Sequence, residues 1–171
     1  MTTACFVAVA GAVGLALSPA LAAQDAPELA NWFEDPFFAV SSAIPGCPTP
    51  LGPLMTKTEM ERQAHVRVER GMRCYQEGKC RKASSYQYDA EIAQNLRAAL
   101  ANSPALKGTS VWVTVQRRWV YVQGCVDSMS RKRALERIAR SIPDVLDVFV
   151  DVTTDASKSL PYPPLDPSHR R

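Results

Sequence analysis

Apolar side chains in the second half of the chain follow two different periods. Valines alternate with other residues over 111–115, over 119–126 and over 148–152, which predicts three strands, the first two joined as a β-hairpin. Over 89–101 and over 128–142 the apolar residues recur at helical intervals instead. The order helix, strand, strand, helix, strand predicts a small α+β sandwich in which two helices cover one face of a three-stranded sheet.

A further helix is predicted upstream of this unit. Thr56 and Glu59 have the spacing of a capping box, which satisfies free backbone donors at a helix start. Apolar residues then recur every three or four positions, which predicts one helix over 57–77: Met60, Ala64, Val68, Met72 and Tyr75. The remaining positions carry several arginines, including Arg67, and are expected to form a solvated surface.

The two ends of the chain have a different composition. Of 13 prolines, most lie before residue 60 or after residue 160, so these parts are expected to be irregular. An apolar run from Ala4 to Leu17 is followed by the small-residue site Ala20-Leu21-Ala22, which predicts a cleaved signal peptide and export to the periplasm, a retained anchor being the alternative. The expected organisation is a signal peptide (1–22), a Pro-rich irregular extension (23–55), an extra helix with a cysteine loop (56–86), the α+β domain (87–153) and a Pro-rich disordered tail (154–171).

Cleavage after residue 22 would leave four of the five cysteines: Cys47, Cys74, Cys80 and Cys125. In an exported protein these are expected to form two disulfides. Three pairings are possible; local closure between Cys74 and Cys80 would leave Cys47 to pair with Cys125. A zinc site would need closely spaced cysteines with clustered histidines, and the chain has only two histidines, so no metal is expected.

The charge balance limits the class of partner. Twenty Lys and Arg against 17 Asp and Glu give a net charge of +3, too small for a dedicated nucleic-acid binder but enough for weak attraction to anionic phospholipid. The basic residues of the predicted helix over 128–142 are the candidate lipid-binding residues: Arg131, Lys132, Arg133, Arg137 and Arg140. The alternative is that they form an ordinary solvated helix surface.

The alternation also predicts an aromatic face on the other side of the sheet. If the valines face the helices, the opposite face carries Trp112, Trp119, Tyr121 and Phe149 together with Cys125. Such a face is either covered by another part of the chain or binds a partner. We favour cover by residues 32–54, because a disulfide from Cys47 to Cys125 would draw them across it. The alternative is a platform on which glycan rings, such as those of peptidoglycan, stack.

Residues 89–153 resemble the BON domain, a module of bacterial periplasmic and envelope proteins. The resemblance rests on Val111-Trp-Val-Thr-Val115, Val120-Tyr-Val-Gln-Gly-Cys-Val126, Ser130-Arg-Lys-Arg-Ala134 and Ile138-Ala-Arg-Ser-Ile-Pro-Asp-Val145. Arg118 and Pro143 stand where the family usually has glycine, so the hairpin turn is expected to be of another type. The resemblance implies non-catalytic binding in the envelope, commonly to phospholipid, with stress-protective roles in some members.

Motifs of catalysis are absent from the sequence. It has no Gly-rich phosphate loop and no nucleophile elbow, and its carboxylates show no paired spacing. We therefore expect no enzyme activity and no cofactor. The leading hypothesis is weak binding to anionic phospholipid in an envelope-maintenance or stress role. The alternatives are a protein-interaction module of an envelope or secretion complex, and glycan binding through the aromatic face.

Overall fold

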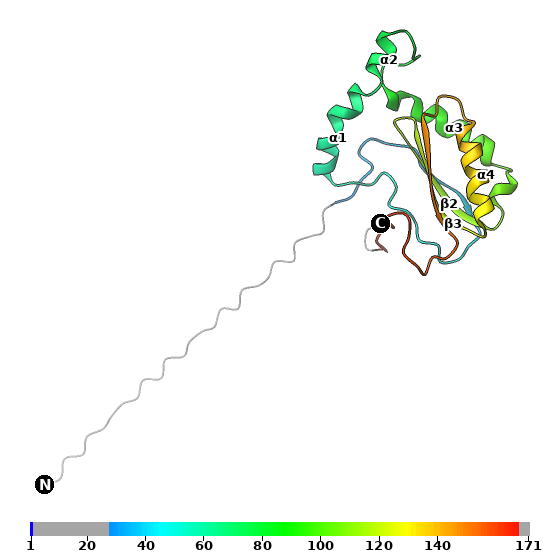
Figure 1. The fold of residues 1–171 in the computed structure, drawn as a ribbon. Coiled ribbons are helices and arrows are strands. Elements are labelled where there is room, and N and C mark those ends of the chain that lie inside the picture. Colours follow the sequence, from blue (N-terminus) through cyan, green and yellow to red (C-terminus); the bar gives the residue numbers. More distant parts are fainter. Residues whose placement is uncertain (2–27, 168–171) are drawn as a thin grey trace.

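The computed structural model describes residue 1 and residues 28–167; the predicted signal peptide lies outside the described residues apart from its first. Five elements follow in the predicted order: α3 (Asp89–Leu100), β2 (Thr109–Gln116), β3 (Trp119–Val126), α4 (Met129–Arg140) and β4 (Asp147–Thr153). Short 3-10 helices, Ser85–Tyr88 and Pro104–Leu106, precede α3 and β2. Helices α3 and α4 cover one face of the sheet (Figure 1), so the α+β fold is confirmed.

The core lies between the sheet and these two helices. Every second side chain of the central strands points into it, among them Val113 and Val122, which are 0% and 2% exposed. Leu96 of α3 and Leu135 of α4 pack on them with 0% and 1% exposure. A period of two in the strands and a period near 3.6 in the helices thus place one apolar face of each element in the same layer. Among the described residues, no helix is long and apolar enough to cross a bilayer.

The sheet has four strands, one more than the sequence pattern predicts. Strand β1 (Phe37–Ser42) pairs antiparallel with β2, and the strand order is β1-β2-β3-β4 with β3 and β4 parallel. The expectation of an irregular segment is therefore wrong for residues 37–42. Prolines flank this short run on both sides, and the register shifts between Ala39 and Ser41, so the strand lacks the clean alternation that would identify it. An edge strand tolerates such a bulge because only one of its sides is paired.

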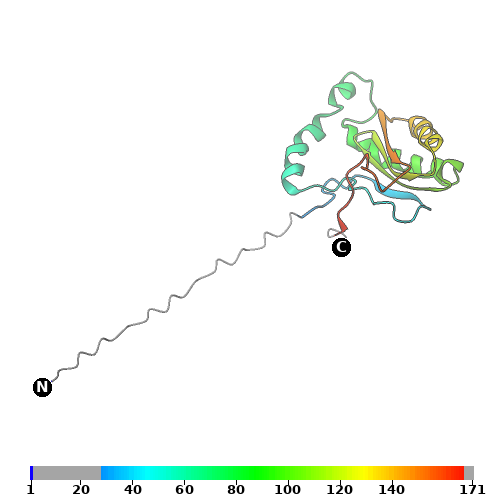
Figure 2. The same cartoon turned by 60° about the horizontal axis from the view of Figure 1, so that its bottom comes forward.

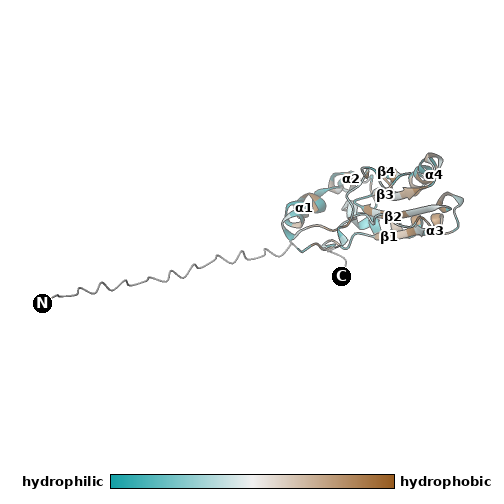
Figure 3. Ribbon diagram, turned by 90° about the horizontal axis from the view of Figure 1, so that it is seen from below, coloured by the Kyte–Doolittle hydropathy of each residue, from teal (hydrophilic) through white to brown (hydrophobic). Residues whose placement is uncertain are grey.

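The predicted helix over 57–77 is two helices, α1 (Lys57–Glu69) and α2 (Met72–Gln76), here called the arm. Gly71 adopts a φ of 98° between them, a conformation that breaks a helix and suits glycine. The apolar face expected to be buried is open to solvent, with Val68 54% and Tyr75 50% exposed. Figure 3 shows why: the arm lies beside the strands on the side away from α3 and α4, outside the core that these helices cover.

The C-terminal segment is ordered over the part that the structure describes, which corrects the expectation of a disordered tail. The N–H of Leu51 donates to the carbonyl of Pro163, and the N–H of Leu165 donates to the carbonyl of Thr49, both at 2.8 Å. Tyr162, which directly precedes Pro163, is 3% exposed. Proline lacks an N–H but keeps its carbonyl, so a Pro-rich segment can still accept these bonds. Figure 2 shows this orange-to-red segment running back to the cyan segment that follows β1.

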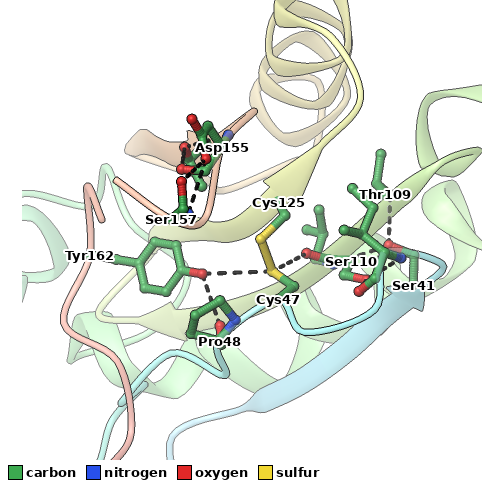
Figure 4. The surroundings of a disulfide bond; sticks show 12 residues. Ser41, Cys47, Pro48, Thr109, Ser110, Cys125, Asp155, Ser157 and Tyr162 are labelled. Atoms are coloured by element: carbon green, nitrogen blue, oxygen red, sulfur yellow. Dashed lines mark hydrogen bonds between the residues drawn. A yellow bond between two sulfur atoms is a disulfide. The ribbon is translucent and has the colours of Figure 1, made fainter. Parts of the chain in front are cut away.

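Two disulfides join Cys47 to Cys125 and Cys74 to Cys80. The first links the segment after β1 to strand β3, on the sheet face that carries no helix (Figure 4). The hydroxyl of Tyr162 lies 3.8 Å from Cys47 Sγ and donates to the Pro48 carbonyl at 2.8 Å. The disulfide therefore holds the segment after β1 on the sheet, and the hydrogen bond from Tyr162 holds the C-terminal segment on the segment after β1. Residues 43–55, which follow β1, are called the strap below.

Candidate functional site

Two of the five basic residues predicted on α4 are neutralised by carboxylates. Arg131 Nε lies 3.1 Å from Asp127 Oδ1, and the Arg140 guanidinium pairs with both Glu136 and Asp147 at 3.0 and 3.1 Å. The hydrogen bond from Arg131 holds the pKa of Asp127 below its usual value. These two arginines are therefore poor candidates for attracting an anionic surface, because their charge is already compensated.

The other three basic residues keep their charge free. Within residues 28–167, no carboxylate lies within ion-pair distance of Lys132, Arg133 or Arg137. The spacing of four places Arg133 and Arg137 on the same outer side of α4, and Met129 lies one turn earlier with 49% exposure. These four residues are called the α4 stripe: Met129, Lys132, Arg133 and Arg137.

The opposite sheet face carries the predicted aromatic residues, and three of them are in contact. The Tyr121 and Phe149 rings stack with centroids 5.1 Å apart and an interplanar angle of 16°, and Trp119 packs edge-on to Phe149 at 5.8 Å. Neighbouring strands explain this, because Tyr121 is the register partner of Phe149. Trp112 lies in the next row, opposite Gln123. The aromatic residues therefore form a cluster at the β3–β4 side of the face.

The strap covers only part of this face. Gly52 lies against the ring of Phe37, so close that a Cβ on Gly52 would be 2.9 Å from the ring, and the disulfide at Cys125 holds the neighbouring end of the face. Trp112, Trp119 and Tyr121 are half-buried, whereas Phe149 remains 37% exposed. The strap thus leaves an opening beside Tyr121 and Phe149.

A groove of about 300 Å³ lies on this face, with Tyr121 but not Phe149 in its lining. Its floor is the sheet and its walls are the strap and α1. The strap contributes the non-polar residues 52–55, whereas the sheet and α1 contribute polar residues: Glu59, Gln63, Thr114, Gln116, Tyr121 and Gln123. The sequence reasoning did not identify these polar residues as a site. The period of two places Thr114, Gln116 and Gln123 on the aromatic face, but only the tertiary structure brings α1 next to them.

Two arginines, called the arginine pair, lie over Trp119, whose register partner Gln116 lines the groove. Arg70 Cζ is 3.7 Å and Arg117 Cζ is 5.7 Å from the Trp119 ring centroid. Within residues 28–167 neither forms an ion pair, and Arg117 Nε is shielded from solvent without a hydrogen-bond partner. Burial and the neighbouring Arg70 lower the pKa of Arg117. The pair is therefore a site of uncompensated positive charge next to an aromatic cluster.

Asp89 positions Arg117 by holding the hairpin turn. Its two carboxylate oxygens accept the backbone N–H groups of Arg117 and Arg118, each at 2.7 Å. Both arginines have positive φ, 54° and 68°, as a two-residue type I′ turn requires. Asp89 thus stabilises, with two non-glycine residues, a turn conformation that glycine favours. Burial raises the pKa of Asp89 to about 6.

A buried ion pair positions Arg70 by anchoring α1. Arg67 is the one residue of α1 that is buried, and its guanidinium pairs with Asp35, with one bond of 3.1 Å. Gln116 Nε2 also donates to Asp35 at 2.8 Å, and Phe33 lies 4.4 Å beneath the Arg67 guanidinium. The expectation that Arg67 faces solvent is therefore wrong. Three residues after it, Arg70 is held over the sheet.

Comparison with known proteins gives one match. Residues 88–155 match the family model of the BON domain. No curated protein and no solved structure matches the chain. BON domains are typical of periplasmic and envelope-associated proteins and are generally non-catalytic, so the match supports a role of that kind. The region that matches contains α3, the hairpin, α4 and β4, and the match supports a BON domain over residues 88–155 of the chain.

Proposed function

We propose that the protein associates weakly and reversibly with anionic phospholipid at the cell envelope through the α4 stripe. The observation that carries this proposal is the separation of paired from unpaired cations on α4. Lys132, Arg133 and Arg137 have no carboxylate partner within residues 28–167, whereas Arg131 and Arg140 are compensated. The exposed Met129 adds an apolar side chain at one end of the stripe.

The expected strength follows from the number of free cations. A Lys or Arg near an anionic membrane surface contributes about 1 kcal/mol, so three contribute about 3 kcal/mol, or roughly a 100-fold partition at low salt. The attraction weakens as the Debye length falls from about 30 Å at 0.01 M salt to about 8 Å at 0.15 M. Such binding would keep the protein at the membrane surface without anchoring it, consistent with a role in envelope maintenance.

Co-sedimentation with vesicles tests the proposal. The oxidised protein should sediment with vesicles that contain phosphatidylglycerol, more at low than at physiological salt, and not with pure phosphatidylcholine vesicles. The variant Arg133→Gln/Arg137→Gln should lose this binding. The matched control Arg62→Gln/Arg73→Gln removes the same net charge from the arm, where both residues are paired with glutamates, and should retain it. Equal loss in both variants would show attraction by net charge and would refute a site on α4.

The arm favours a second candidate, a protein-interaction module of an envelope complex. Val66, Val68, Met72 and Tyr75 are each between 41% and 54% exposed, and they lie within ten residues of one another outside the BON match. Although Val66 and Val68 lie on different sides of α1, several large apolar side chains left exposed on one short segment are a feature of surfaces that bind a protein. If the vesicle experiment shows no binding at either salt, this candidate takes first place. It would then be tested by substituting Val68 and Met72 with serine and measuring recovery of an envelope partner.

A further inference from the structure

We propose that the groove and the arginine pair together form a binding site for an acidic saccharide, with the sugar ring in the groove and its carboxylate or phosphate on Arg70 and Arg117. This site is independent of the α4 stripe, because it lies on the sheet face that carries no helix. Its ligand is a sugar rather than a lipid surface. The two proposals can therefore fail separately.

The positive charges of Arg70 and Arg117 are the reason to expect an anionic group on the ligand. Arg70 and Arg117 approach the same Trp119 ring, although like charges repel and no carboxylate within residues 28–167 forms an ion pair with either. Arg117 Nε is already removed from water and has no acceptor there. A guanidinium fork matches a carboxylate or a phosphate, so such an anion would satisfy both arginines at once.

The side chains that line the groove are the reason to expect a sugar ring in the ligand. Three groups there have no hydrogen-bond partner within residues 28–167, the Gln123 amide and the hydroxyls of Thr114 and Tyr121. Amides and hydroxyls both donate and accept, as the hydroxyls of a sugar do. The ring of Tyr121, which stacks on Phe149 outside the groove, adds an aromatic surface to the lining for the apolar side of a pyranose.

The size and position of the groove argue against other ligands. A volume of about 300 Å³ is at the lower end for ligand clefts, which suits one or two sugar rings. The floor of the groove is the middle of the sheet, where the backbone groups of β2 and β3 pair with each other. A peptide could not add there as an extra strand, because it needs a free edge.

Isothermal titration tests the site with three probes: oligogalacturonate, the neutral maltotetraose and inorganic phosphate. Oligogalacturonate should bind at least about tenfold more tightly than either of the others, since it alone presents both a sugar ring and a carboxylate. Arg70→Gln should weaken this binding about tenfold, and Gln123→Ala should weaken it without changing the net charge. Arg117→Asn should do the same as Arg70→Gln and preserve the turn, because asparagine tolerates a positive φ.

Two controls and three outcomes decide the proposal. Arg73→Gln on the arm and Arg133→Gln/Arg137→Gln on α4 should leave saccharide binding unchanged, and all variants should unfold at the temperature of the natural chain within a few degrees. Equal affinity for phosphate and oligogalacturonate would show that the site binds anions in general, and would overturn the proposal that it recognises a sugar. Equal binding of maltotetraose would remove the role of the arginine pair. No binding of oligogalacturonate by the folded, oxidised protein would refute the site altogether.

Discussion

The two disulfides should contribute very differently to stability, because they close loops of very different length. Cys47 and Cys125 are 78 residues apart in sequence, whereas Cys74 and Cys80 are 6 apart. In the chain-entropy description, closing a loop removes about 2.1 + 1.5R ln n cal/mol/K from the entropy of the unfolded chain, where n is the loop length. At 25 °C this is about 4.5 kcal/mol for the long loop and about 2 kcal/mol for the short one.

The location of each disulfide increases this difference. Cys125 is 3% exposed in the sheet, and its bond holds the strap and the tail on that face. Cys74 and Cys80 lie at α2, away from the core, so their loop is expected to open without unfolding the BON domain. Replacing Cys47 and Cys125 by alanine should therefore remove about 4–5 kcal/mol, a large part of the roughly 5–15 kcal/mol that stabilises a typical domain.

Equilibrium urea unfolding of the oxidised protein measures both effects. Cys47→Ala/Cys125→Ala should lower the free energy of unfolding by at least about 2 kcal/mol more than Cys74→Ala/Cys80→Ala. Circular dichroism and tryptophan fluorescence should report the same midpoint in each variant. An equal cost for the two pairs, or a larger cost for the short loop, would refute the reasoning from loop length.

Three further predictions concern stability. In the natural chain the pKa of Asp89 is about 6 in the folded state and 3.8 in the unfolded state, so stabilisation of about 3 kcal/mol that is present below pH 4 is lost as the pH rises to 6. Asp89→Asn should abolish this pH dependence of the free energy of unfolding. Parallel pH profiles of urea unfolding for the two proteins would contradict the prediction. Arg67→Met should cost about 3–5 kcal/mol by leaving Asp35 buried and unpaired, and adding Asp35→Asn should restore part of it in a double-mutant cycle. Gly52→Ala should cost about 1–3 kcal/mol in thermal unfolding, because φ is 63° and the new Cβ would meet Phe37, and an unchanged midpoint would show that the strap adjusts freely.

The sequence alone determined the part of the fold whose signals are local. Alternating valines and helical spacing identify β2, β3, β4, α3 and α4, because each element needs only one apolar face of the correct period to join a core. The same periodicity placed Trp119, Tyr121 and Phe149 on one face of the sheet. Motifs within these elements were enough to indicate the BON domain.

Tertiary contacts between distant segments decided the remainder. β1 and the tail are held by partners far along the chain, so their own composition, rich in proline, indicates only irregular structure. The sequence pattern predicts that Arg67 is a surface residue, because its partner Asp35 lies 32 positions earlier and only the fold places the two side by side. Likewise, whether a cation of α4 or of the arginine pair is paired depends on which carboxylates the fold places next to it. The groove depends on α1 and the strap packing beside the sheet. Periodicity predicts which way a side chain points, but a contact is set only when two elements pack, and the proposed binding surfaces of this protein are made of such contacts.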